Sequence, residues 1–319
     1  MGRFIVRRLL GMIVVLFAVS VLVFLIFNVI PNNDPAAAIA GKNKTPELVH
    51  QVRKEFGLDK SLPVQYVTMM KKIFTGDLVS YSSRLNVDDQ IKKGIPATFS
   101  LCIGAAVIWM AFGVLFGYLS AVRAGRFTDR ALTILALVGI SLPVFWLASI
   151  LLYYLTFKIQ LFPNGQYVKL TQDPVQWANH LILPWITLAV LYIGFYSRVL
   201  RSNMLDVMDE DYVRAARAKG LNERQVRVRH VLRNSLIPIV TLFGLDFGAV
   251  IGGGAIITES IFSINGVGLY ASDAITNLDL PPLMAITMFG AFFIVLFNTL
   301  VDIAYAWLDP RIRLGESAA

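Results

Sequence analysis

Long apolar runs separated by polar segments dominate this chain of 319 residues. The first run, residues 9–30, contains 22 residues without a charge. A helix needs about 20 such residues to cross a membrane, because the hydrocarbon core is about 30 Å thick and each residue rises about 1.5 Å. Five later runs have a similar length and composition: 97–122, 131–157, 181–197, 235–258 and 283–308. Because backbone groups in lipid must be bonded within their own segment, the pattern predicts an all-α integral membrane protein with six transmembrane helices.

The polar segments between the runs divide the chain into four parts. Residues 1–30 form the N-terminal segment and first span, and residues 31–96 form an extracytoplasmic loop. Residues 97–308 form the transmembrane core, with a cytoplasmic loop at 198–234, and residues 309–319 form a tail. The triplet "AIA" at 38–40 resembles a signal cleavage site, but the first run is longer than a signal core, which favours an uncleaved anchor.

The extracytoplasmic loop is expected to be helical. "TPELVHQVRKEFGL" has an N-cap threonine, Thr45, then Pro46 at the first helical position and a stop at Gly57. "LPVQYVTMMKKIF" has the pattern of a second amphipathic helix that ends at Gly76.

The distribution of basic residues predicts the orientation. If the N-terminus is cytoplasmic, 17 of the 29 Lys and Arg residues lie inside, and 10 of the 12 outside lie in the long loop. Long loops cross largely regardless of charge, so the short loops decide the topology, with 17 basic residues inside and 2 outside. Both termini are therefore predicted to be cytoplasmic. The net charge of +8 reflects this topology and indicates no nucleic-acid partner.

Two acids and several breaker residues interrupt the apolar runs. Pro143 predicts a kink in the third run. In the fifth run, the glycines at 252–254 favour tight helix packing over a helix break, and both alternatives stay open. A carboxylate at the centre of a bilayer costs about 2.5–3.5 kcal/mol, so Asp246 either lines a pathway or bonds another helix. Asp302 lies near the inner end of its run and is expected to reach interfacial water or the basic residues at 311 and 313.

Catalytic chemistry is not indicated. The chain has one cysteine, Cys102, and three histidines without metal-ligand spacing. "GKNKT" at 41–45 lacks the features of a nucleotide-binding loop. The sequence therefore predicts no catalytic residue, no metal and no cofactor bound by this chain.

The most unusual segment is "DYVRAARAKGLNERQVRVRHVLRN", residues 211–234, which carries seven basic and two acidic residues. Its alanine-rich first half favours a helix that ends at Gly220. Asn222 then caps a second helix, with Gln225 in the reciprocal position of the capping box. A helix–glycine–helix element on the cytoplasmic face is typical of a docking element for a soluble partner.

"RAARAKG" is similar to the Glu-Ala-Ala-x-x-x-Gly loop of permease subunits from binding-protein-dependent ABC importers. Ala215, Ala216 and Gly220 hold that spacing, and Arg214 stands in place of the glutamate. This departure, and "RHVLRNSLIP" after it, are typical of the dipeptide, oligopeptide and nickel branch. "TESIFSINGVGLYASDAI", with Asn265 where a proline is usual, and "NTLVDIAYAWLDPRIRL" also resemble that branch.

The resemblance implies the type I permease fold of ABC importers and a transport subunit without enzymatic activity. Its implied partners are a second homologous permease in a heterodimer, two cytoplasmic ATPases that bind ATP and Mg, an extracytoplasmic substrate-binding protein and membrane lipid. The location would be a prokaryotic cell membrane, and the binding protein would dock near residues 260–282. The expected cargo is di- or oligopeptides; nickel, glutathione or another small solute is the alternative, and an ATP-independent channel or a membrane enzyme is a remote one.

The resemblance also implies a coupling function, driven by alternating access, for the cytoplasmic loop. The residues expected to couple this chain to an ATPase are Asp211, Tyr212, Arg214, Ala215, Ala216, Lys219, Gly220, Leu221, Arg229 and His230. The residues expected in the translocation pathway are Asp246, Gly252 and Gly253.

Overall fold

The computed structural model describes residues 2–29, 36 and 45–308. The cleavage-site triplet, most of the "GKNKT" segment and the tail lie outside these residues. Within them the regular elements are helical, and the extended pairing amounts to an isolated antiparallel bridge between Val79 and Asn86. The helices are α1 (Gly2–Val29), α3 (Pro46–Glu55), α4 (Leu62–Thr75), α5 (Val87–Val122), α6 (Phe127–Ser141), α7 (Val144–Leu151), η1 (Leu152–Lys158), α8 (Pro174–Met208), α9 (Asp211–Ala218), α10 (Glu223–Gln225), η2 (Val226–Leu232), α11 (Arg233–Ala249), η3 (Val250–Gly254), α12 (Ile256–Ile261), α13 (Val267–Thr276) and α14 (Leu280–Leu308).

The described residues contain five helices long and apolar enough to span a membrane, and a bent pair that makes a sixth. The bent pair joins Phe127–Ser141 to Val144–Lys158 at an angle of 98°. Pro143 lies at the break as the N-cap of α7, in extended conformation. The predicted all-helical membrane fold and the predicted kink are therefore confirmed.

Two spans are longer than the apolar runs indicated. α5 begins at Val87, within the predicted extracytoplasmic loop, and α8 has 35 residues where the apolar run has 17. Asp173 starts α8 early, because its side chain accepts hydrogen bonds from the backbone N–H groups of Val175 and Gln176. At the other end α8 continues past the predicted limit at Arg198, because helical backbone bonds do not need an apolar side chain on every residue.

By contacts between Cα atoms the chain forms two compact units. The first unit comprises Met1–Thr98, Ile251–Ile256 and Asn265–Ala319, and the second comprises Phe99–Val250 and Ile257–Ile264. Each unit has its own packing among the described residues.

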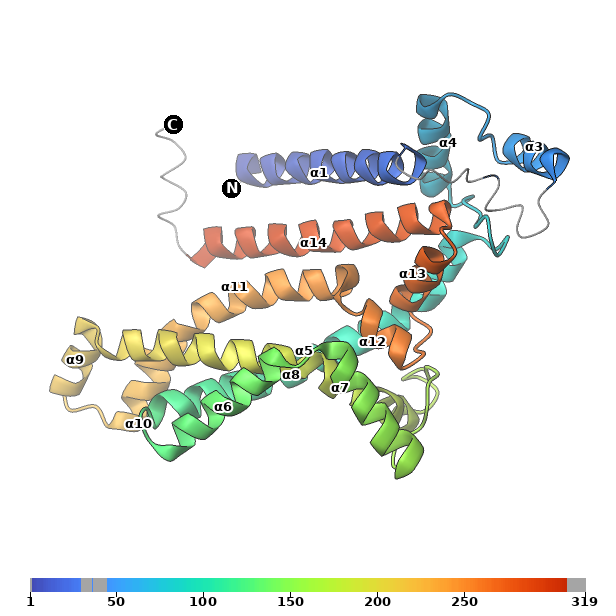
Figure 1. The fold of residues 1–319 in the computed structure, drawn as a ribbon. Coiled ribbons are helices and arrows are strands. Elements are labelled where there is room, and N and C mark those ends of the chain that lie inside the picture. The colour runs from blue at the N-terminus through green and yellow to red at the C-terminus, as the bar shows by residue number, and fades with distance from the viewer. Residues whose placement is uncertain (1, 30–35, 37–44, 309–319) are drawn as a thin grey trace. The chain divides into compact units, whose positions relative to one another are not determined.

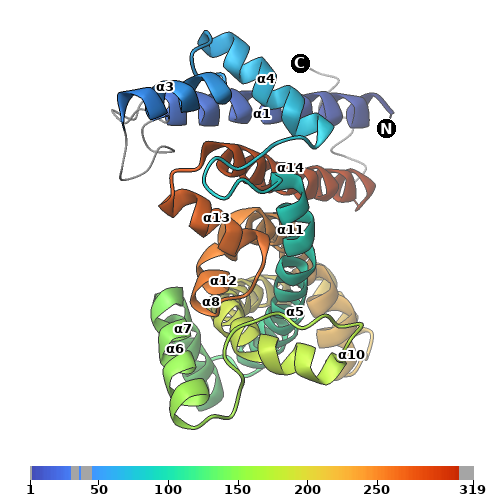
Figure 2. The ribbon, with the colours of Figure 1, turned by 90° about the vertical axis from the view of Figure 1, so that its right-hand side faces the viewer.

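In the first unit α1 and α14 pack side by side, and α13 packs on α14 (Figures 1 and 2). α4 crosses α1 near its C-terminal end, where the Tyr66 hydroxyl lies 2.6 Å from the hydroxyl of Ser20. The predicted N-cap is confirmed in α3, because Thr45 Oγ1 accepts from the N–H of Leu48 at 3.2 Å. The predicted stop is confirmed in α4, where Gly76 adopts a φ of +77°.

Asp302 has a partner that the sequence did not indicate. Its Oδ2 lies 3.0 Å from Nη1 of Arg8 on α1, so the acid ties α14 to α1. Residues 311 and 313, the expected partners, lie outside the described residues.

A buried acid, Asp279, holds the segment between α4 and α5 to the start of α14. Its carboxylate accepts hydrogen bonds from the hydroxyls of Ser80 and Ser82, at 2.5 and 2.6 Å. The backbone N–H groups of Tyr81 and Ser82 donate to it at 2.9 and 3.2 Å. Because this carboxylate belongs to a residue that is 3% exposed, it orders the segment between α4 and α5 through four donors.

In the second unit α8 is central and packs against α6, α7 and α11. α5 approaches α8 closely through two glycines spaced four residues apart. A Cβ atom on Gly113 would lie 2.8 Å from the Cβ of Tyr196, and one on Gly117 would lie 2.8 Å from the Cβ of Leu200. Small residues at this spacing let two helices approach within a membrane.

Candidate functional site

The predicted helix–glycine–helix element is present at the end of α8 (Figure 1). α9 (Asp211–Ala218) follows α8 after a two-residue turn and packs against α8 and η2. Val213 and Ala216 are the buried residues of α9. Ala215 is exposed, although the sequence predicts the same role for Ala215 and Ala216. The tight packing of Ala216 is therefore internal, and Ala215 belongs to the outward face.

Most of the predicted coupling residues share that outward face. The exposed members are Asp211, Tyr212, Arg214, Ala215, Lys219, Gly220, Leu221 and Arg229. His230 is half-buried. Seven of the ten thus lie on the accessible part of α9 and the turn after it, Arg229 and His230 lie on η2, and Ala216 turns inward.

Gly220 makes the turn between the two arms of the element, which are α9 and the helical run that begins with α10. Its φ is +82°, and no atom lies within 4 Å of the position that a Cβ would occupy. Its N–H donates to the carbonyl of Arg217 at 3.0 Å, and the N–H of Leu221 donates to the carbonyl of Ala216 at 3.4 Å. The glycine is required by the left-handed backbone and not by crowding, because L-residues with a Cβ are strained there.

The second arm is a continuous helical run from α10 through η2 into α11. The side-chain oxygen of Asn222 accepts from the N–H of Gln225 at 2.8 Å, which confirms the predicted N-cap. The side-chain amide of Asn234 donates to the hydroxyl of Tyr212 at 2.7 Å and to the carbonyl of His230 at 2.9 Å. The bond to Tyr212 joins α9 to the helical run that contains His230 and Asn234.

Charges are distributed unevenly over this element. Glu223 pairs with Arg217 at 3.0 Å and with Arg227 at 3.5 Å, and Arg214 pairs with Asp211. Four exposed cations of residues 211–234 take part in none of the salt bridges found among the described residues: Lys219, Arg224, Arg229 and Arg233. The surface consequently offers positive charge to an acidic partner surface.

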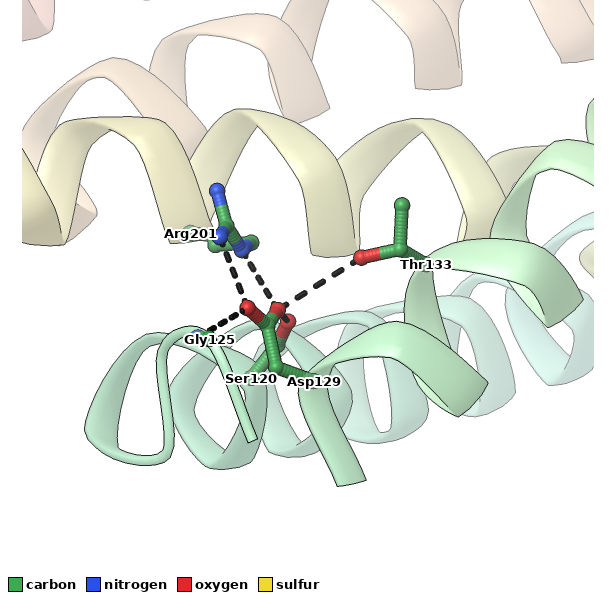
Figure 3. A network of polar contacts seen from close by, with 5 residues as sticks. All are labelled: Ser120, Gly125, Asp129, Thr133 and Arg201. Atoms are coloured by element: carbon green, nitrogen blue, oxygen red, sulfur yellow. Dashed lines mark hydrogen bonds and ion pairs between the residues drawn. The ribbon is translucent and has the colours of Figure 1, made fainter. Parts of the chain in front are cut away.

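A buried ion pair anchors α8 about two turns before its C-terminal end (Figure 3). The guanidinium of Arg201 donates two hydrogen bonds to Asp129 of α6, from Nε at 2.7 Å and from Nη2 at 2.8 Å. The hydroxyl of Ser120 and the N–H of Gly125 donate to the same carboxylate at 2.5 and 2.8 Å. α5, the turn after it, α6 and α8 therefore meet at one carboxylate.

The predicted pathway residues lie in two environments. Asp246 of α11 is half-buried and accepts a hydrogen bond from the hydroxyl of Tyr196 at 2.7 Å. Gly252 is packed tightly, because a Cβ there would lie 2.9 Å from the carbonyl oxygen of Gly290. Gly253 interrupts the helical backbone, so both alternatives for the glycine run, tight packing and a break, occur one residue apart. No observation tests a pathway role for these three residues, which stays a prediction.

Sequence reasoning missed the residues that position the element. Val213, which buries the inner face of α9, is one hydrophobic residue in a charged helix, and its spacing of three from Ala216 was the available signal. In the sequence Asp129 and Arg201 are indistinguishable from loop and topology charges, and only the folded chain brings them together. The glycines at 113 and 117 have the small-xxx-small spacing that signals helix packing in membranes.

Several helices that could span a membrane, with a helix–glycine–helix element between two of them, are typical of a transport permease subunit. The family described as "Binding-protein-dependent transport system inner membrane component" matches residues 113–314, and the family of its N-terminal part matches residues 1–102. The chain belongs to this family of inner-membrane transport components. Membership confirms the resemblance drawn from the sequence, the multi-pass membrane location, and the expectation that the chain is a transport subunit and not an enzyme.

Curated relatives align along almost the whole chain. "Probable peptide ABC transporter permease protein y4tP" of Sinorhizobium fredii is 38% identical over 98% of this chain and 100% of its own length. "Probable D,D-dipeptide transport system permease protein DdpB" of Escherichia coli is 34% identical over 97% of each chain. "Glutathione transport system permease protein GsiC" of Escherichia coli is 36% identical over 98% of this chain and 99% of its own length.

Proposed function

We propose that this chain imports short peptides as one of two permease subunits of an ATP-driven transporter in the cell membrane of a prokaryote. The names of the peptide and D,D-dipeptide relatives support this cargo. The glutathione relative supports the alternative of a small solute that is itself a modified tripeptide. The second permease is a homologous but different chain, and an extracytoplasmic binding protein delivers the cargo near residues 260–282.

The observation that carries the proposal is the division of α9 into two faces. Val213 and Ala216 fix the helix to its own chain, and the opposite face is exposed, with the unpaired cation Lys219 at its end. That face docks into a groove on one cytoplasmic ATPase, and ATP and Mg bind to the ATPases. When the ATPases close, α9 transmits the movement to α8 through a short turn, and to α11 through the Gly220 turn and the helical run that follows it. The pathway, which includes Asp246, Gly252 and Gly253, then opens to the opposite side.

Both termini lie in the cytoplasm in this proposal. The distribution of Lys and Arg over the short loops supports that orientation. The cytoplasmic location of the coupling element follows from it, because the element lies between α8 and α11.

Gly220→Val tests the coupling role. The substitution strains a backbone with a φ of +82°, and it leaves the buried face of α9 unchanged. The complete importer, reconstituted in proteoliposomes, is expected to keep its ATPase activity and to lose at least about tenfold in peptide uptake per ATP hydrolysed.

Gly57→Val is the matched control. Gly57 also has a left-handed backbone, with a φ of +68°, and a Cβ there would meet only the Lys60 side chain, at 3.8 Å, but it lies between α3 and α4, outside the coupling element. Uptake per ATP hydrolysed should be preserved in this control. Equal losses in both variants, or normal coupling in Gly220→Val, would contradict the coupling role of this turn.

The cargo is tested separately. Uptake of a labelled dipeptide by the same proteoliposomes, with the cognate binding protein, is compared with uptake of labelled glutathione and of nickel. Preferential uptake of the dipeptide supports the proposal, and preferential uptake of glutathione or nickel selects the alternative.

A further inference from the structure

Asp246 is a carboxylate within a membrane-spanning segment that remains partly exposed. It lies on α11, within the candidate membrane span Glu223–Gly254, and it is half-buried. A carboxylate that faced hydrocarbon at this depth would cost about 2.5–3.5 kcal/mol, so the exposed part must face water or a group of opposite charge.

Within the part of the chain that the structure describes, no cation pairs with the charge of Asp246. Its one hydrogen bond within the described residues comes from the Tyr196 hydroxyl, which donates to Oδ2 at 2.7 Å. None of the salt bridges in the described part of the chain includes Asp246. Tyr196 is fully buried and therefore fixes the carboxylate while the other oxygen, Oδ1, stays available.

An aromatic cluster from three helices lies beside Tyr196, the residue that bonds this carboxylate. The ring of Trp109 on α5 stacks on Tyr192 of α8 with centroids 4.5 Å apart, and it lies 6.0 Å from the ring of Phe243 on α11. The centroids of the Trp109 and Tyr192 rings each lie 6.5 Å from that of Tyr196. Tyr192 lies one turn before Tyr196 on α8, and Phe243 lies one turn before Asp246 on α11; both are half-buried.

A fixed carboxylate beside half-buried aromatic rings is the chemistry that recognises an organic ammonium group. A metal cation is disfavoured, because the described residues contain no group of three or more His, Cys, Asp or Glu side chains that could hold one. We propose that Asp246, fixed by Tyr196 and flanked by Tyr192 and Phe243, binds the terminal ammonium group of the cargo peptide. The inference rests on the proposed peptide cargo and adds the part of the peptide that this chain recognises.

Binding to the purified importer without its binding protein or nucleotide tests the site directly. The probes are Ala-Ala-amide, which carries an ammonium group, and N-acetyl-Ala-Ala-amide, which does not; their affinities are measured by ligand-observed NMR. The unaltered complex is expected to bind the first probe about tenfold more tightly, which corresponds to about 1.4 kcal/mol.

Three substitutions separate charge from structure. Asp246→Asn keeps an acceptor for the Tyr196 hydroxyl and removes the charge, so the preference should fall to less than about twofold. Tyr196→Phe keeps the charge but frees the carboxylate, and the preference should be intermediate. Asp302→Asn is the control. It alters the second acid of the predicted apolar runs, Asp302, which pairs with Arg8, and it should leave the preference unchanged.

The outcomes distinguish this inference from the function on which it rests. An unaltered complex that imports peptides but binds both probes equally overturns the ammonium site alone. The ammonium site is also overturned if Asp246→Asn keeps the preference, or if it prevents the second permease from co-purifying, since Asp246 would then pair with the partner. A complex that imports no peptide overturns the proposed function first.

Discussion

The ion pair between Asp129 and Arg201 should contribute more to stability than its surface counterparts. The Asp129 side chain is 6% exposed and the Arg201 side chain is 31% exposed, and two hydrogen bonds of 2.7 and 2.8 Å join them. Removing one partner of a buried pair costs about 3–5 kcal/mol, because the other charge is left in a poorly solvated site. Arg201→Met should cost about 4 kcal/mol. Asp129→Asn should cost about 3 kcal/mol, since the guanidinium retains some contact with solvent.

A double-mutant cycle isolates the interaction. Asp129→Asn, Arg201→Met and the double variant are unfolded reversibly in mixed micelles, and the free energies of unfolding are compared. The coupling energy should be at least about 2 kcal/mol, in the range for hydrogen bonds to charged groups.

The control cycle uses Arg84 and Glu55, which lie 2.7 Å apart but have side chains 50% and 57% exposed. Its coupling energy should stay below about 1 kcal/mol. If the two cycles gave the same coupling energy, the buried network of Figure 3 would stabilise the protein no more than a surface pair does, and the reasoning from burial would be refuted.

Packing at three other places can be tested in the same way. Ala215→Leu should leave the thermal stability unchanged and lower uptake per ATP hydrolysed, whereas Ala216→Leu overpacks a residue 6% exposed and should cost about 1–3 kcal/mol of stability, as a melting series would record. Gly117→Leu would place a Cβ 2.8 Å from the Cβ of Leu200, so α5 and α8 must separate; cysteine cross-linking yields between these helices should fall, and unchanged yields would contradict the close approach. Asp279→Ala leaves four donors without their acceptor and should cost about 3 kcal/mol, measured as faster proteolysis between α4 and α5 at unchanged cleavage elsewhere.

Local signals in the sequence predicted much of the fold because each acts within a few residues. The cap at Thr45, the stop at Gly76 and the break at Pro143 all appear in the structure. The positions of helix ends were predicted less accurately, because an apolar run marks the part of a helix that lies in lipid and not the part that continues beyond it. Asp173 and Val87, which begin two of the long helices, lie outside the apolar runs for this reason.

The candidate site was predictable in its outline and not in its orientation. Gly220 and Asn222 defined the two arms, since a left-handed turn and an N-cap depend on adjacent residues. Which of Ala215 and Ala216 faces outward depends on where η2 packs, and that is a property of the folded chain. The ion pair of Asp302 with Arg8 was likewise set by the packing of α1 on α14, which joins residues far apart in the sequence.

The π-helical segment η2 leads into α11, and Gly253 interrupts the helical backbone beyond the other end of α11. A π-turn holds one residue more than an α-turn, so converting η2 to α-helix would move the residues of α11 by one place along the helix, with the break at Gly253 taking up the change. Such a register shift rotates the helix by about 100°, the angle per residue of an α-helix. The rotation would move Asp246 away from Tyr196 and release the ammonium group that we propose it binds. A change in the backbone hydrogen bonds of one turn would thus control the release of the cargo.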